Sequence, residues 1–267
     1  MRKRPVINVL SIVVAMLIAG GCATNATVSP GVRQVLAPTG KLRAGYYPGS
    51  PTSMIKDASG EIKGVGYDLG SELAARLGIP FEPVVFERNA QVLDAVKSGR
   101  IDITLTNATP ARTKDMDFTP PLFQVELGFL LPPNSKITVM ADVDRPGIRV
   151  GVSEGSTSEG ALSRELKNAV VVRAPTLKNA IDMLSSGKID AFATNKAILF
   201  EMSDELAGSR VLRERWGLEN FAMGIPKGRE LAMPFLGQFV DGAKADGIVG
   251  RAIERAGLRG TLGEVSR

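Results

Sequence analysis

Residues Val92 to Asn107 read VLDAVKSGRIDITLTN, and Ala180 to Asn195, 88 positions later, read AIDMLSSGKIDAFATN. The shared residues include polar ones that an apolar periodicity does not require, so one structural unit is predicted to occur twice. In each copy an amphipathic helix ends at a glycine suited to the left-handed cap conformation, and an apolar strand then finishes in Thr-Asn. The identical pairs are Asp94/Asp182, Ser98/Ser186, Gly99/Gly187, Ile101/Ile189, Asp102/Asp190, Thr106/Thr194 and Asn107/Asn195. Two copies predict two similar lobes; the alternative is a chance echo of a common helix-glycine-strand pattern.

Predicted strands and helices alternate on both sides of this unit, which favours an α/β fold with a mostly parallel sheet covered on both faces. Strands are expected at 41–47, 81–86, 101–106, 124–131, 149–153, 170–173, 191–194 and 221–225, with helices at 68–77, 92–98, 158–166 and 177–184. Residues 229–256 are predicted to form helices interrupted near Gly247. No dinucleotide or P-loop motif occurs, so nucleotide binding has no support.

The N-terminus has the pattern of an export signal. Basic residues precede an apolar run, 9–19, that is too short to span a bilayer, and small residues then lead to Cys22. This spacing resembles the lipobox of bacterial lipoproteins. It predicts a signal peptide at 1–21, a lipid anchor on Cys22, a tether at 22–39 and a periplasmic or extracytoplasmic location. An ordinary signal peptide with an incidental cysteine is the alternative.

Composition excludes several kinds of function. Removing residues 1–21 removes three basic and no acidic residues, so the net charge falls from +5 to 30 minus 28, or +2, and no nucleic-acid partner is indicated. The chain has one cysteine and no histidine. Catalysis by Ser-His-Asp or Cys-His groups is therefore excluded, and neither a metal site nor a cofactor is predicted.

Polar side chains stand where the predicted strands end, which is where open α/β sheets bind ligands. These ends are Tyr46-Tyr47, Thr106-Asn107, Ser153-Glu154 and Thr194-Asn195. Thr109 and Pro110 are predicted to begin a helix that brings free N–H groups together with Arg112, which would form a carboxylate receptor. A surface arginine paired with Asp115 or Asp117 is the alternative. Ser156 and Thr157 form a second polar turn, for which simple helix capping is the alternative.

From about residue 40 to 256 the chain resembles the family 3 solute-binding proteins of ABC importers, the polar amino acid group. The resemblance rests on GKLRAGYY, GYDLGSELAARLG, SGRIDITLTNATPARTKDMDFT, VGVSEGST, SGKIDAFATN and FAMGIPKG, in this order. Its most specific part is Thr-Pro-Ala-Arg112 followed by Asp117-Phe-Thr, similar to the family's T-P-E-R…D-F-S segment. The resemblance implies that Arg112 holds the carboxylate of a ligand, helped by the Ser156-Thr157 turn.

The family fold implies two lobes joined by two crossover strands that act as a hinge, the type II periplasmic-binding-protein fold. The crossovers would lie near 128–131 and 222–225. Lobe 1 would comprise residues 40–128 and 226–267, and lobe 2 residues 129–225. The resemblance further implies a small carboxylate-bearing ligand, a membrane permease as partner, a monomeric state and no enzymatic activity.

Some positions depart from the family pattern. Asn195 stands where an aspartate usually holds the ligand's ammonium, and a neutral amide cannot balance a buried positive charge. Either the ligand lacks an ammonium or another carboxylate serves, with Glu154 as the nearest candidate and a solvated turn glutamate as the alternative. Ser50, Ser53 and Asn89 replace frequent aromatic residues, and Tyr46 or Tyr47 would compensate. The pocket is therefore predicted to be unusually polar.

Two other functions fit the same fold. Cyclohexadienyl dehydratases resemble this family, and such an enzyme would need a cleft acid, for which Glu154 or Glu159 are available. A periplasmic ligand sensor is the other possibility. No feature of the sequence distinguishes a sensor from an importer component.

Overall fold

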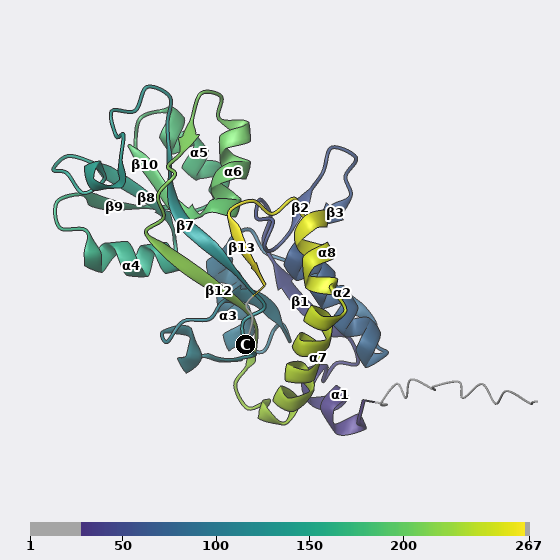
Figure 1. Cartoon of the computed structure of the whole chain (residues 1–267). Coiled ribbons are helices and arrows are strands. Elements are labelled where there is room, and N and C mark those ends of the chain that lie inside the picture. The colour runs from purple at the N-terminus through teal and green to yellow at the C-terminus, as the bar shows by residue number, and fades with distance from the viewer. Residues whose placement is uncertain (1–27, 265–267) are drawn as a thin grey trace, which may run out of the picture.

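The protein folds into two α/β lobes, and the structure is a computed structural model in which residues 28–264 are described (Figure 1). The predicted signal peptide and Cys22 lie outside these residues. Among residues 28–264, no helix combines the length and the apolar character needed to cross a bilayer.

Lobe 1 is built around the parallel strands β1 and β4, with the chain leading into β5 joined to β1 by a bridge between Ala44 and Ile103. Its elements are α1 (Pro30–Leu36), β1 (Leu42–Tyr46), β2 (Ile55–Lys56), β3 (Ile62–Lys63), α2 (Val65–Leu77), β4 (Phe81–Val85), α3 (Asn89–Lys97), β5 (Thr104–Asn107), η1 (Arg112–Lys114), β6 (Met116–Phe118), η3 (Glu230–Ala232), α7 (Met233–Ala245) and α8 (Ile248–Arg255). The predicted apolar face of α2 is confirmed, because Leu69, Leu73 and Leu77 are fully buried.

Lobe 2 has the parallel strands β8, β9 and β10, with helices packed against them. Its elements are η2 (Met140–Asp142), β8 (Arg149–Ser153), α4 (Thr157–Glu165), β9 (Val170–Ala174), α5 (Leu177–Ser185), β10 (Ala191–Asn195), α6 (Lys196–Glu205) and β11 (Arg210–Val211). The apolar clusters of lobe 2 are separate from the main cluster of lobe 1. Each lobe therefore has its own hydrophobic core.

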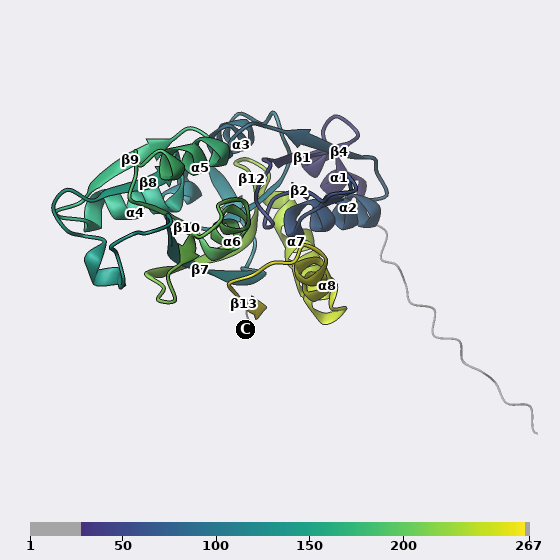
Figure 2. The same ribbon diagram turned by 90° about the horizontal axis from the view of Figure 1, so that it is seen from above.

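Two long antiparallel strands, β7 (Phe123–Leu131) and β12 (Gly217–Pro226), run between the lobes (Figure 2). The second half of β12 pairs with β5 of lobe 1, and the second half of β7 pairs with β10 of lobe 2. Where the two strands pair with each other, the rings of Phe123 and Phe221 stack with centroids 5.1 Å apart. Strand β13 (Thr261–Glu264) also pairs with β7. This is the predicted arrangement of two crossover strands between two lobes.

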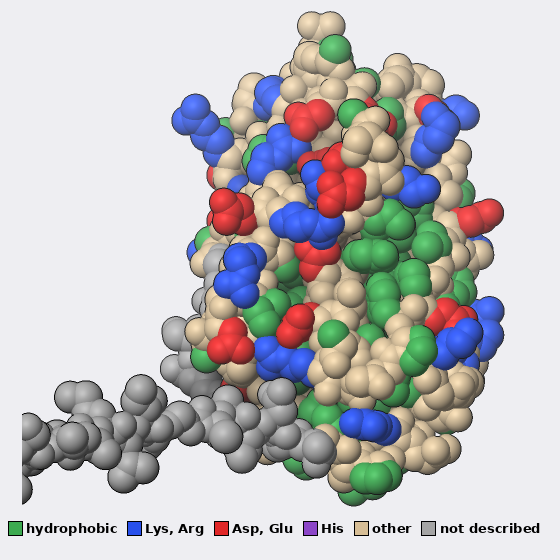
Figure 3. Space-filling view, turned by 90° about the vertical axis from the view of Figure 1, so that its right-hand side faces the viewer, with side chains coloured by type: hydrophobic (Ala, Val, Ile, Leu, Met, Phe, Trp, Pro, Cys, Tyr) green, Lys and Arg blue, Asp and Glu red, His purple; other side chains and the backbone are tan. Residues whose placement is uncertain are grey.

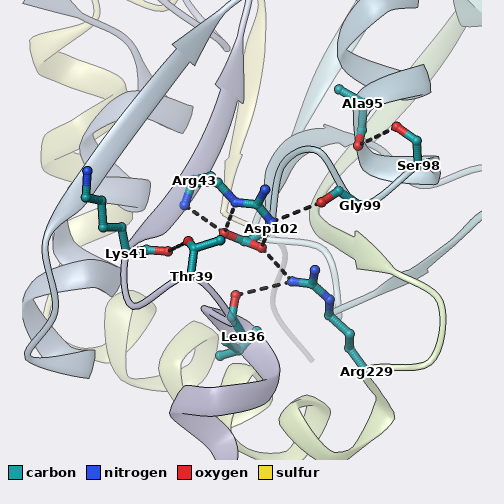
Figure 4. Close-up of polar contacts among 9 residues, drawn as sticks. All are labelled: Leu36, Thr39, Lys41, Arg43, Ala95, Ser98, Gly99, Asp102 and Arg229. Carbon is teal, nitrogen blue, oxygen red and sulfur yellow. Dashed lines mark hydrogen bonds and ion pairs between the residues drawn. The ribbon is translucent and has the colours of Figure 1, made fainter.

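The two copies of the repeated unit fold alike. Asp102 accepts hydrogen bonds from the backbone and the guanidinium of Arg43 on the neighbouring strand, and Asp190 accepts the same set from Arg149. Figure 4 shows that Asp102 is also approached by Arg229, whose Nη1 lies 2.8 Å away. The glycines that follow the helices, Gly99 and Gly187, have φ values of 70° and 67°, as the left-handed cap requires.

The structure corrects two expectations about local structure. The predicted tether is wrong in its second half, because residues 30–36 form helix α1, capped by the side chain of Ser29, and Leu36 is fully buried in lobe 1. The helix expected after Thr109 is only the single turn η1, although Thr109 Oγ1 does accept from the N–H of Arg112 at 3.3 Å. The predicted break near Gly247 is confirmed between α7 and α8, where Gly247 has a φ of 67°.

Acidic and basic side chains are interspersed on the face of the molecule in Figure 3, with no extended area of a single sign. This face therefore has no electrostatic footprint for a polyanion.

Candidate functional site

A cavity lies between the lobes, at the carboxyl ends of their strands. The atom-free space between its walls, including the part open to solvent, is about 660 Å³. Its walls are formed by Tyr47, Pro48, Glu87, Arg88, Asn89, Leu105, Thr106, Asn107, Arg112, Ser153, Glu154, Ser156, Thr157, Pro175, Thr176, Leu177, Thr194, Asn195, Ile198, Glu219 and Phe221. The structure thus brings together all seven predicted ligand-binding residues, Tyr47, Asn107, Arg112, Glu154, Ser156, Thr157 and Asn195. Their contact with a ligand stays a prediction.

Arg112 projects into this cavity and is held by lobe 1. Its Nη1 donates to the hydroxyl of Thr106 at 2.7 Å and to the carbonyl oxygen of Asn107 at 3.1 Å. Its Nη2 reaches across to the carbonyl oxygen of Gly155 in lobe 2 at 3.3 Å. The alternative pairing does not occur, because Asp115 and Asp117 pair with lysines instead. Burial lowers the pKa of Arg112, and nearby Glu219 opposes this change.

The lobes also touch through Asn107 and Thr157. The Nδ2 of Asn107 donates to the hydroxyl oxygen of Thr157 at 3.0 Å. The orientation of this amide is fixed, because its Oδ1 accepts from the N–H of Asn220 on β12 at 2.8 Å. Asn107 therefore connects lobe 1, the hinge strand and lobe 2, and the structure represents a conformation in which the lobes are closed on each other.

An ion pair closes the rim of the cavity. The Nη1 of Arg88, just before α3, lies 2.7 Å from a carboxylate oxygen of Glu154, and both side chains are well exposed at 39% and 46%. The Nε of Arg88 is buried and has no hydrogen-bond partner within the described part of the chain, residues 28–264. Glu154 therefore lines the cavity, but its carboxylate is occupied by a guanidinium.

Asn195 has a different environment from the one expected of a residue that faces an ammonium. Its Oδ1 caps helix α6 by accepting from the N–H of Ile198 at 3.2 Å. Its Nδ2 therefore remains as the donor, and it lies 3.0 Å from Oε2 of Glu219. Both side chains are buried, with exposures of 3% and 7%.

Glu219 is a cavity residue that the sequence pattern did not reveal. It lies on β12 opposite Val125, two residues before the predicted start of that strand. Burial raises the pKa of its carboxyl group, while Arg112, Asn195 and Thr157 stabilise the ionised form and limit the rise. The prediction missed it because Gly217, Glu219 and Asn220 interrupt the apolar run by which the strand was located.

The tyrosines have separate roles. Tyr46 is buried in the core of lobe 1, where its ring contacts those of Tyr67 and Phe81, so it does not compensate for missing aromatic residues in the pocket. Tyr47 lines the cavity, and burial raises its pKa to about 12, so its hydroxyl stays neutral as a donor at ordinary pH. Ser53 accepts from the N–H of Tyr47 at 3.0 Å and thereby supports the loop.

The turn before α4 is stabilised from within. Ser156 Oγ accepts from the N–H of Glu159 at 3.1 Å, and a carboxylate oxygen of Glu159 accepts from the N–H of Gly155 at 2.6 Å. Glu159 also pairs with Arg173. Because Glu159 is engaged in this capping interaction and is absent from the cavity wall, it is badly placed to act on a ligand. Residues 28–264 contain no cluster of three or more acidic, cysteine or histidine side chains able to hold a metal ion.

Comparisons with known proteins find similarity to one family. Residues 42–169 match the model of the bacterial extracellular solute-binding proteins, family 3. The chain is also 26% identical over 195 residues to the ABC transporter glutamine-binding protein of Bacillus subtilis, with 71% of each chain covered. Over this region the chain is similar to the family 3 solute-binding proteins.

Solved structures of solute-binding proteins have the same fold as this chain. The solute receptor for L-cysteine of Neisseria gonorrhoeae superimposes with a TM-score of 0.75 at 25% identity, covering 84% of this chain and 92% of the receptor. An ancestral amino acid-binding protein, a precursor of cyclohexadienyl dehydratase, gives a TM-score of 0.71 at 25% identity, covering 84% of this chain and 97% of the other. The two-lobed fold predicted from the sequence is therefore confirmed.

Proposed function

We propose that this protein is the extracytoplasmic binding component of an ABC importer and captures an amino acid, or a closely related carboxylate, between its lobes. The single observation that supports this most is the position of Arg112 in the interlobe cavity, where it is held by lobe 1 and reaches lobe 2. The relatives named for glutamine and for L-cysteine support an amino acid as the ligand class.

In the proposed mechanism, the ligand's carboxylate binds the guanidinium of Arg112. Charge-assisted hydrogen bonds of this kind contribute about 1.5–3 kcal/mol each, and a planar guanidinium can form two in parallel. The ligand also takes contacts from the turn at Ser156 and Thr157, so it binds well only when both lobes reach it. Ligand binding is in this way coupled to closure about β7 and β12.

The closed form would be the species that a membrane permease recognises. A lipid on Cys22 would keep the monomeric protein close to that permease. Closure is required because it presents surfaces of both lobes together. A signalling protein that recognises the closed form would make the same chain a sensor. Adjacent genes for a permease and an ATPase would favour import.

A second candidate function is an enzyme in which a cavity acid protonates a leaving group. The observation that favours it is Glu219, a buried carboxyl group with a raised pKa, in a fold shared with the precursor of cyclohexadienyl dehydratase. The acids suggested by the sequence are less suitable, because Glu154 pairs with Arg88 and Glu159 with Arg173. Binding remains the better proposal, since it requires no reacting group.

A thermal-shift screen of the purified protein against the L-amino acids and a set of small organic acids tests the proposal. We expect at least one amino acid to raise the melting temperature in the wild type and to be recovered unchanged, as shown by mass spectrometry. Failure of every carboxylate to bind would contradict the proposal. Chemical conversion of the bound compound would contradict the binding proposal and favour the enzymatic function instead.

A further inference from the structure

A buried acidic side chain at the hinge forms no ion pair within 4.0 Å among residues 28–264, although the guanidinium of Arg112 lies near enough to favour its charged form. Glu219 is 7% exposed, and no lysine or arginine of residues 28–264 has a nitrogen within 4.0 Å of its carboxylate. The groups that hydrogen-bond to it are instead neutral, the amide of Asn195 and the hydroxyl of Thr157. A buried carboxylate in this state is costly unless a positive charge or further donors complete its environment. The cavity that Glu219 lines is the place from which such a charge can come.

The surrounding residues fix this carboxylate in position. Asn195 cannot turn its amide without losing the cap of α6, so its donor stays directed at Glu219. On the adjacent residue of β12, the N–H of Asn220 is held by the side chain of Asn107. The two asparagines that end the repeated units therefore meet neighbouring residues of one hinge strand, one from each lobe.

The other carboxylates near the cavity are less suited to a cationic ligand group. Glu154 is paired with Arg88 at the exposed rim, and Glu159 is bound to Arg173 and to the turn it stabilises. Glu87 lines the cavity but is exposed to solvent, where an ion pair contributes little. Glu219 alone among these is deeply buried.

We infer that Glu219 is the receptor for a cationic nitrogen of the ligand, and that Asn195 is a positioning residue that holds its carboxylate in place. This rests on the proposed function and narrows the ligand class to zwitterions, in which a carboxylate and an ammonium lie a few atoms apart. Arg112 and Glu219 supply two opposite charges to one cavity, and no guanidinium nitrogen lies within 4.0 Å of the carboxylate oxygens. A zwitterionic ligand would pair its carboxylate with Arg112 and its ammonium with Glu219. The negative charge that the family pattern places at position 195 in lobe 2 is supplied instead by Glu219 on the hinge strand β12.

The test compares each amino acid that binds the wild type with its deaminated analogue, which keeps the carboxylate and lacks the ammonium. Calorimetric titration is carried out on the wild type, on Glu219→Gln and on Glu165→Gln, an exposed control at the end of α4. We expect Glu219→Gln to lose at least about tenfold in affinity for the amino acid. Its affinity for the deaminated acid should stay the same or rise, and the control should match the wild type.

A second variant tests whether the site lacks a negative charge for the ammonium or already has one in Glu219. Asn195→Asp keeps the helix cap but places a second carboxylate beside Glu219. If Glu219 already provides the charge, this variant should not bind amino acids more tightly. Tighter binding would overturn the inference, as would unchanged amino acid affinity in Glu219→Gln.

The inference and the proposed function fail in different ways. A wild type that binds only acids without an amino group would overturn the role of Glu219 while leaving the carboxylate receptor intact. A wild type that binds no carboxylate at all would overturn both. The melting temperature of each empty variant shows whether it is folded, and the isosteric glutamine can still accept the hydrogen bond of Asn195.

Discussion

The side-chain amide of Asn195 donates to the carboxylate of Glu219 across 3.0 Å, and this bond ties the end of a lobe 2 strand to the hinge strand β12. It explains how an asparagine can stand where a negative charge is expected without leaving the site neutral. The charge lies on a residue 24 positions later in the chain, and the asparagine orients it.

The stability of the empty protein should depend on pH through Glu219. Burial raises the pKa of this group in the folded state, so its contribution favours folding below the unfolded-state pKa, near 4.3, and is lost as pH rises through the higher folded-state value. Replacing Glu219 by Gln removes this loss. We therefore expect the variant's free energy of unfolding, relative to the wild type, to increase between about pH 4 and pH 8.

Urea unfolding of both proteins at the two pH values, without ligand, provides the measurement. We expect Glu219→Gln to gain stability and to lose affinity for the amino acid. This combination is typical of a residue that serves binding and destabilises the folded protein. If the difference between variant and wild type were the same at both pH values, the carboxyl group would not have a raised pKa in the folded protein.

The repeated unit offers an internal comparison of two equivalent ion pairs. Asp102 is fully buried and pairs with Arg43 and Arg229, whose side chains are 19% and 13% exposed. The equivalent Asp190 is 31% exposed and pairs with Arg149 at 42%. Removing Asp102 leaves two largely buried guanidinium groups unpaired, so Asp102→Ala should destabilise the protein by about 3–5 kcal/mol.

Asp190→Ala should cost much less, about 1 kcal/mol, since both partners can be solvated. Chemical unfolding of the two variants side by side tests this. Equal losses would show that exposure does not control the strength of these pairs, contrary to what their environments predict.

Much of the fold was predictable because it depends on patterns local in the chain. The leucine spacing of α2, the glycines after the repeated helices and the alternation of strands and helices each act over a few residues, and the resemblance supplied the connection of the lobes. Helix α1 was missed because seven residues with a proline at the first position show no sustained period. Its burial depends on contacts with lobe 1.

The candidate site was predictable only in part, for a related reason. Residues at the ends of parallel strands meet at one edge of a sheet, which is why Asn107, Asn195 and Thr157 could be placed together from the sequence. Glu219 lies near the start of β12, and its relation to Asn195 depends on how β7 pairs with both β10 and β12. No short-range signal carries that information.

The ion pair between Arg88 and Glu154 should favour the closed form only slightly. Both side chains are more than one-third exposed, and pairs of this kind contribute about 0–1 kcal/mol. Glu154→Gln should therefore weaken amino acid binding by no more than about fivefold, with the effect shrinking at high salt. Calorimetric titration at low and high ionic strength measures both quantities. A loss of a hundredfold would instead mean that Glu154 contacts the ligand.

The central claim is that Arg112 receives the carboxylate of an amino acid, and calorimetric titration of Arg112→Ala with the amino acid that binds the wild type tests it most directly. Truncating one partner of a buried charge pair costs about 2–5 kcal/mol, so the affinity should fall by at least about 30-fold. Arg33→Ala, an exposed substitution on α1, should bind as the wild type does. Undiminished affinity in a folded Arg112→Ala variant would contradict the account.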